Sequence, residues 1–193
     1  MTRSTATLPA RIRTLDPDEY PATIPALADL LVDAVRGGAA VNFLASITDE
    51  EARAWWVERS GQVVDGTMTV FVAEERASDG TRGGPIVGSA ILVRSRFQNS
   101  PHRAEVGKVL VHRSVRRQGL GRALMEAVEA CARADGRWLL LLDTQTGSAA
   151  ETLYRALGWH ELGTMPNHSY GSNGVLSPTT FFWKDLRNAL GDR

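Results

Sequence analysis

The sequence is short of cysteine. Its 193 residues include only one, Cys131, which excludes a disulfide within the chain and a metal cluster built from cysteines. Cys131 falls in helical register with Leu124 and Val128, a position that favours a small core residue over a nucleophile. The histidines do not have the spacing of metal ligands either, and we expect no metal site; they are His102, His112, His160 and His168.

Net charge and long apolar runs are also absent. Lys plus Arg and Asp plus Glu each number 22, so no basic field points to nucleic acid as a partner. No apolar run approaches the length of a membrane span, and the polar residues 1–15 lack the apolar core of a secretion signal. We expect a cytoplasmic enzyme or binding protein that has neither a nucleic-acid nor a membrane partner.

The length of the chain predicts one domain over residues 1–193, with residues 1–8 disordered. A helix is expected from Asp16-Pro17 to about Arg36, where Gly37-Gly38 stops it, and the capping box Thr48-x-x-Glu51 predicts another that ends near Arg59. Later helices are expected at 119–135 and 148–157. Apolar patterning predicts strands at 10–15, 68–74, 86–94, 103–111, 138–143, 160–165 and 179–184, with a loop at 78–85 inside a hairpin. This order predicts a mixed α/β sheet with helices on both faces.

The segment from Arg103 to Ala123 carries the clearest functional signal. It begins as an apolar strand in which Gly107 marks a bulge, and an arginine and glycine turn at 116–121 then opens a helix. The first turn of a helix has unpaired N–H groups and a partial positive charge, which suit a phosphate or pyrophosphate. Three arginines add full charges around this turn: Arg116, Arg117 and Arg122.

The spacing of this turn differs from that of a P-loop or a dinucleotide fingerprint. Arg-x-x-Gly-x-Gly at 116–121 instead resembles the acyl-CoA pyrophosphate motif of the GNAT family, the Gcn5-related N-acetyltransferases. LYRALGW at 153–159 resembles the GNAT helix whose tyrosine faces the CoA sulfur. Residues 103–186 are similar to the tabtoxin resistance subgroup through AEVGKVLV, LMEAVE, LLDTQTGSAAETLY, a turn at 163–166 and the run GVLSPTT at 174–180.

The resemblance implies an α/β (α+β) GNAT fold, with about seven mostly antiparallel strands and one splayed strand pair that admits acetyl-CoA. It implies that backbone groups of Val109, Leu110 and Val111 pair with pantetheine and polarise the thioester. It assigns the pyrophosphate to the turn and the helix start: Arg116, Arg117, Gln118, Gly119, Gly121 and Arg122. Gly147 stands where many family members have asparagine, and Ser148 is a weak substitute for that contact to CoA.

The resemblance also implies catalytic roles. An amine acceptor with a pKa near ~10.4 must lose a proton before attack. Two carboxylates are candidates for the base, and we favour Asp143, at the end of its strand, over Glu105, which is equally plausible as an exposed strand residue. Tyr154 would return a proton to the CoA thiolate, although a tyrosine in this helical pattern is by itself more often a core residue.

Features on the acceptor side leave alternatives open. Trp55 and Trp56 lie about 100° apart on their helix, so one lines a pocket or both cover neighbouring elements. His168 and Tyr170 are expected in a loop that sets specificity. We expect an acetyltransferase that acts on the amine or hydroxyl of a small amino-acid-like molecule. The resemblance further suggests that its role is to detoxify an antimetabolite. The alternatives are a protein or peptide N-acetyltransferase and a non-catalytic CoA-binding sensor. The sequence does not fix the oligomeric state, and a homodimer is one option.

Overall fold

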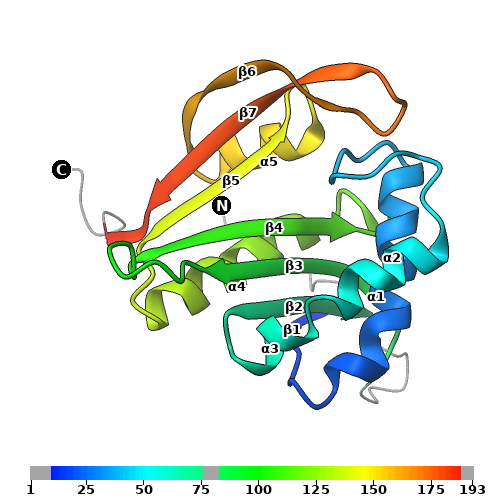
Figure 1. Cartoon of the computed structure of the whole chain (residues 1–193), viewed down its shortest axis with the longest axis horizontal. Coiled ribbons are helices and arrows are strands. Elements are labelled where there is room, and N and C mark those ends of the chain that lie inside the picture. The colour runs from blue at the N-terminus through cyan, green and yellow to red at the C-terminus, as the bar shows by residue number, and fades with distance from the viewer. Residues whose placement is uncertain (1–9, 76–82, 188–193) are drawn as a thin grey trace, which may run out of the picture.

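Residues 10–75 and 83–187 are described by the computed structural model, and they form one seven-stranded sheet in the order β1-β2-β3-β4-β5-β7-β6 (Figure 1). The pairings are antiparallel except for β4 with β5, which run parallel. The fold class that the sequence predicts is therefore confirmed. The strands are β1 (Ala10–Thr14), β2 (Met68–Glu75), β3 (Ile86–Arg94), β4 (Arg103–Val111), β5 (Leu139–Gln145), β6 (His160–Tyr170) and β7 (Leu176–Asp185).

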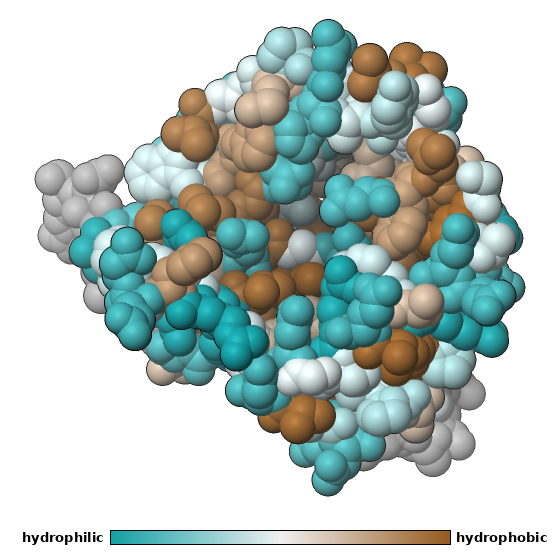
Figure 2. All heavy atoms as spheres, viewed as in Figure 1, coloured by the Kyte–Doolittle hydropathy of each residue, from teal (hydrophilic) through white to brown (hydrophobic). Residues whose placement is uncertain are grey.

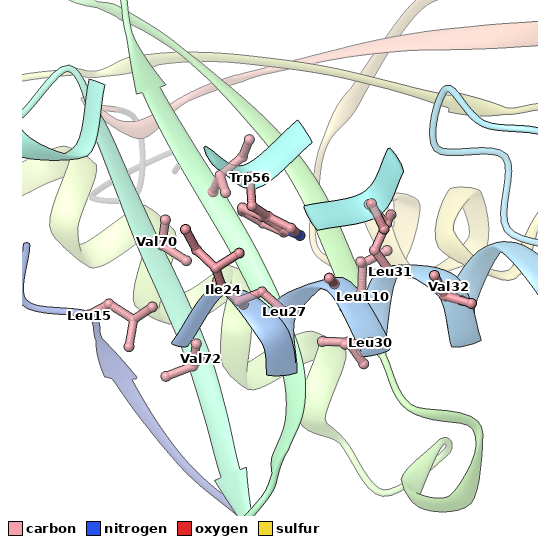
Figure 3. Packing of buried hydrophobic residues seen from close by; sticks show 14 of the residues in the cluster. Leu15, Ile24, Leu27, Leu30, Leu31, Val32, Trp56, Val70, Val72 and Leu110 are labelled. Carbon is pink, nitrogen blue, oxygen red and sulfur yellow. The ribbon is translucent and has the colours of Figure 1, made fainter. Parts of the chain in front are cut away.

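Helices cover both faces of the sheet, and each face has its own apolar core. The first core lies under α1 and contains Leu27, Leu31 and Trp56 with Val70 of β2 (Figure 3). The second core packs α4 and α5 against β3, β4, β5 and β7. The helices are α1 (Tyr20–Arg36), α2 (Asp49–Val57), α3 (Ser60–Val64), the 3-10 turn η1 (Arg113–Val115), α4 (Leu120–Ala134) and α5 (Ala149–Ala156).

Of three helix boundaries predicted near the N-terminus, one is confirmed and two differ from the structure. The capping box is confirmed, because the Thr48 hydroxyl accepts from the Glu51 N–H and the Glu51 carboxylate accepts from the Thr48 N–H. The predicted start of the first helix at Asp16-Pro17 is wrong. Asp16 accepts backbone hydrogen bonds from Glu19 and Tyr20, so a turn precedes α1. The predicted end near Arg59 is also late, since α2 stops at Val57 and the separate α3 follows.

The C-terminal hairpin is longer than the sequence predicts. The pairing of β6 with β7 continues from His160↔Trp183 to Tyr170↔Leu176, with register shifts at 161–163 and 165–169. The turn expected at 163–166 is therefore wrong, because Gly163, Thr164 and Met165 pair with β7. The expectation that His168 and Tyr170 lie in a loop is therefore wrong, because both belong to β6. The expected loop at 78–85 and the expected disorder of residues 1–8 fall wholly or largely outside the described residues.

A buried ion pair joins the elements that surround the second core. Nζ of Lys184 on β7 lies 2.8 Å from a carboxylate oxygen of Glu129 on α4, and it also donates to the carbonyl of Leu157 just after α5. The indole N–H of Trp159 donates to the same carboxylate at 3.1 Å. The network therefore holds α4, β7 and the end of α5 in one arrangement.

Replacing one partner of this pair tests its structural role. We expect Lys184→Met to lower the free energy of unfolding by about 3 kcal/mol, because it leaves the Glu129 carboxylate buried without its main cation. Urea denaturation of the variant and of the double variant Lys184→Met/Glu129→Met provides the measurement, and the double variant should recover most of the loss. A loss below about 1 kcal/mol in the single variant would show that the pair does not hold the fold.

Candidate active site

A wedge opens where β4 and β5 separate. Their parallel pairing covers only three positions and ends at Glu105↔Leu141. Beyond this point β4 remains paired with β3 up to Val111, while β5 remains paired with β7 up to Gln145. Figure 1 shows the two strands diverging from their common end, and the same face is hollowed near its centre in Figure 2. The edge of β4 that faces the wedge has no strand partner among the described residues.

A bulge lies in β4 on one side of this wedge. Ser89 of β3 is opposite Leu110, whereas Ile91 is opposite Gly107, so β4 has an extra residue between these pairs. The sequence predicts a bulge at Gly107, and the residue with a left-handed backbone is its neighbour Lys108, with φ of 46°. The Ser89 hydroxyl stabilises this backbone by donating to the Lys108 carbonyl at 3.1 Å. Val109 and Val111 then pack on the second core and Leu110 on the first.

The arginine turn leads from β4 into α4 and leaves amides exposed. Arg117 and Gly119 both have positive φ, of 63° and 85°, and Gly119 is the N-cap of α4 without a side-chain cap. The first N–H groups of this 15-residue helix therefore have no capping side chain. The exposed residues of the turn include Arg116, Arg117 and Gln118, and Nε of Arg116 donates to the Val111 carbonyl at 3.0 Å.

Gly121 and Arg122, which the resemblance assigns to the pyrophosphate, lie close to other side chains of the protein. Gly121 lies where α4 approaches α5, and a Cβ at this position would be 3.0 Å from Cδ2 of Leu153. Its lack of a side chain therefore permits the close contact of the two helices. Arg122 is exposed and lies 3.8 Å from the Glu126 carboxylate, one helical turn along α4.

Tyr154 lies on α5 with 5% of its surface exposed. Its ring packs between Trp159 and Phe182, with both centroids at 6.1 Å. Burial raises the pKa of Tyr154 well above that of a free phenol, and the nearby Asp143 carboxylate raises it further. The phenol therefore stays protonated at neutral pH. Its hydroxyl has no hydrogen-bond partner within 10–75 and 83–187, so it is free to donate.

The two candidate bases lie on the face of the sheet opposite α4 and α5. Leu142 is buried in the second core, so its neighbour Asp143 points to the other face, where it is exposed. Ala104 and Val106 are buried in the same core, which places Glu105 on the same face as Asp143. Asp143 is not at the end of its strand, because β5 continues to Gln145. Glu105 belongs to the last paired position, where the wedge begins, and Asp143 lies two residues beyond its partner Leu141.

Ser148 caps the helix that carries Tyr154. Its hydroxyl accepts from the Glu151 N–H at 3.1 Å and lies 3.2 Å from the Thr144 hydroxyl. The N-cap of α5 is therefore Ser148 and not Asp143. Gly147 has φ of 81°, and its N–H donates to the Glu151 carboxylate at 2.6 Å.

The loop between α1 and α2 meets the turn between β6 and β7. The Ala45 N–H donates to the Ser172 carbonyl at 2.8 Å, which joins this loop to the turn between β6 and β7. Phe43 contacts Trp55 with ring centroids 6.5 Å apart, whereas Trp56 is fully buried in the first core. Trp55 is only partly buried and packs at the edge of the same core.

Lys108 is a site residue that the sequence reasoning missed. The bulge directs it to the face covered by α1 and α2, where Nζ donates to the Val41 carbonyl at 3.1 Å. Nζ lies 4.4 Å from the centroid of the Trp55 ring and 5.8 Å from that of Phe43. A lysine inside an otherwise apolar strand, next to a glycine, was the available signal.

The described residues contain neither a metal-binding group nor a membrane-spanning helix. Within 10–75 and 83–187, no group of three His, Cys, Asp or Glu residues is placed to hold a metal ion. None of the described helices is both long and apolar enough to cross a membrane.

Comparison with known proteins identifies the family. The sequence model of the acetyltransferase (GNAT) domain matches residues 50–161, more than half of the chain. A ribosomal-protein-alanine N-acetyltransferase from Brucella melitensis has a similar structure, with a TM-score of 0.70 and 28% identity over 91% of this chain and 99% of that chain.

Two more distant structures share the fold. The protein yncA from Salmonella typhimurium, solved with its cofactor acetyl-CoA, has a TM-score of 0.68 and 22% identity over 95% of this chain and 98% of its own. The phosphinothricin acetyltransferase from Sinorhizobium meliloti, in complex with AcCoA, has a TM-score of 0.73 and 17% identity over 96% of this chain and 93% of its own. The match to the family model, together with the splayed sheet, shows that the chain belongs to the GNAT acetyltransferase family and is an acyltransferase.

Proposed function

We propose that this protein transfers the acetyl group of acetyl-CoA to the amine, or the hydroxyl, of a small amino-acid-like molecule. The observation that carries this proposal is the wedge between β4 and β5, with Glu105 where it begins, Asp143 farther along β5 and the phenol of Tyr154 near enough to feel the Asp143 charge. Two proteins with the same fold, yncA and the phosphinothricin acetyltransferase, were solved with acetyl-CoA.

Acetyl-CoA would enter the wedge along β4. Its pantetheine arm would pair with the backbone of Val109, Leu110 and Val111 as an added strand, because the β4 edge is unpaired beyond Glu105. One N–H of this segment would polarise the thioester carbonyl. The pyrophosphate would lie at the amide-rich start of α4, held by Arg116, Arg117, Gln118, Gly119, Gly121 and Arg122.

The chemistry is a direct transfer. Asp143 takes a proton from the acceptor ammonium, and the freed amine attacks the thioester carbon. The bond between that carbon and sulfur breaks, and Tyr154 gives its proton to the departing thiolate. The attacking nitrogen loses its second proton to form the amide, and this proton restores the Tyr154 phenol. Glu105 is the alternative base, since it lies on the same face of the sheet as Asp143.

The acceptor end of the wedge favours a small molecule. The hydrogen bond between Ala45 and Ser172 bridges the two sides, and Phe43 and Trp55 add bulk there. The similarity to the tabtoxin resistance subgroup extends this proposal to detoxification of an antimetabolite, and the phosphinothricin acetyltransferase is named for a small acceptor. The second candidate is a peptide N-terminus, which is favoured by the 28% identity to an enzyme named for ribosomal-protein alanine.

A pooled assay tests the acceptor class. The protein is incubated with acetyl-CoA and a pool of amino acids, polyamines, aminoglycosides and antimetabolites, in parallel with a peptide library that carries different N-termini. Thiol release and product mass are followed. One small product heavier by a single acetyl group supports the proposal. Acetylation confined to peptides would refute it in favour of the second candidate.

Substitutions of the acidic and phenolic groups test the mechanism. We expect Asp143→Asn to lower kcat/KM by about 10²- to 10⁴-fold, because it removes the base, and Tyr154→Phe to lower kcat within the same range, because it removes the acid. Glu105→Gln is the matched control and should change kcat/KM by less than about tenfold. A large loss for Glu105→Gln with a small loss for Asp143→Asn would assign the role of base to Glu105 in place of Asp143.

Ser148 is expected to act on stability and not on CoA. Ser148→Ala should lower the free energy of unfolding by about 1 kcal/mol through loss of the α5 N-cap, whereas Ser148→Asn keeps the cap. Thermal denaturation and the KM for acetyl-CoA are measured for both variants. A KM that rises by about tenfold or more in Ser148→Ala, with unchanged stability, would instead assign Ser148 to the cofactor.

We also propose that residues 1–193 form one domain that works in the cytoplasm, without nucleic-acid or membrane partners, and that two copies associate. The final hairpin supports association, because β6 is an edge strand and the hairpin and its turn expose large apolar side chains. These are Leu162, Met165, Tyr170, Val175 and Leu176.

Light scattering measures this association. We expect a dimer for the wild type and a monomer for Leu162→Glu, since the carboxylate would be buried in the interface. A monomeric wild type at micromolar concentration would refute the dimer.

A further inference from the structure

Lys108 is a buried cation that the transfer mechanism leaves without a role. The residue is 8% exposed, and it forms no ion pair with a carboxylate in the described part of the chain. An ammonium has three N–H donors, and the Val41 carbonyl accepts only one of them. The other lysine, Lys184, is buried against the carboxylate of Glu129. Lys108 therefore stands out as a charge that lacks its counterion.

The surroundings of Lys108 add positive charge and no negative contact. Its Nζ lies over the Trp55 ring, and the guanidinium carbon of Arg59 lies 3.6 Å from the centroid of the same ring. Burial and, to a smaller extent, the Arg59 charge lower the pKa of Lys108, the Asp143 charge offsets part of this effect, and the resulting pKa is about 8. The ammonium is therefore still the main form at neutral pH, and an anion placed beside it would be stabilised.

Lys108 lies on the same face of the sheet as the two candidate bases. The bulge turns it toward the face of the sheet that carries Glu105 and Asp143, below the loop that bridges to Ser172. Lys108 on β4 and Asp143 on β5 lie close enough for the carboxylate charge to act on the ammonium. This arrangement matches a molecule that carries an anionic and a cationic group.

We propose that Lys108 binds the carboxylate of an amino-acid-like acceptor while Asp143 holds the amine that is acetylated. This assignment rests on the proposed small-molecule function and specifies its substrate class as zwitterionic. The contact is a charge-assisted hydrogen bond in a site that Phe43 and Trp55 shield from water. Lys108 is thus a specificity residue, and it takes no part in proton transfer.

Matched acceptors with and without a carboxylate provide the test. Kinetics are measured with L-lysine and its decarboxylated counterpart cadaverine, or with the equivalent pair for the acceptor that the pool identifies. We expect Lys108→Met to raise KM for the carboxylated member about 10- to 100-fold, with kcat/KM for the amine changed less than about threefold. The KM for acetyl-CoA should not change. Arg53→Met, which removes an exposed charge of α2, is the control for net charge.

The pH profile separates this role from that of a base. In the wild type, kcat/KM for the carboxylated acceptor should fall as pH rises through about 8, because Lys108 loses its proton there. This limb should be missing in Lys108→Met, while Asp143 and Glu105 on the same face, and Arg59, remain unchanged. A rise through the same range that depends on Lys108 would make it a base and overturn the proposal, as would equal losses for both acceptors.

A binding measurement keeps this inference separate from the proposed function. Thermal denaturation of the CoA complex is followed with L-norleucine and with its decarboxylated counterpart, pentylamine. Norleucine should raise the Tm of the wild type but not of Lys108→Met. This result in the absence of any turnover would support the carboxylate site while refuting the proposed acceptors. Turnover of small amines without protection by norleucine would support the proposed small-molecule function and refute the carboxylate site at Lys108.

Discussion

The site depends on one geometric fact, the short pairing of β4 with β5. Three residue pairs hold these strands together, and each then follows a different neighbour. A continuous ladder would satisfy the β4 backbone and leave no room for a ligand. Because the ladder stops at Glu105↔Leu141, backbone groups at the centre of the sheet are available to an extended molecule.

The two cores keep the wedge open. The first holds β2, β3 and β4 against α1, and the second holds β5 and β7 against α5 while α4 spans both halves. The Glu129 and Lys184 pair fixes the end of α5, the helix that carries Tyr154. The sheet can tolerate this gap because apolar burial in the two cores offsets the hydrogen bonds that β4 and β5 do not form beyond Glu105.

Local signals predicted local structure well. The box at Thr48 and Glu51 gave the start of a helix, and Gly107 indicated the bulge in β4, because each depends on a few neighbouring residues. The helix start predicted at Asp16-Pro17 was wrong because these residues suit a turn as well as the first turn of a helix. His168 and Tyr170 were placed in a loop because the weak pattern of β6 does not show that a bulged strand continues through it.

The sequence by itself determined the fold class, the family and the order of the elements, and it named Asp143, Tyr154 and the arginine turn as candidates. Periodicity and motif spacing carry that information because they reflect contacts between residues close in the chain. Only the tertiary structure decided that Ser148 is a cap, that Trp56 is core and that Lys108 is buried against the Val41 carbonyl. Those roles depend on side-chain direction after a bulge and on contacts such as that of Lys108 with Val41, which no local pattern specifies.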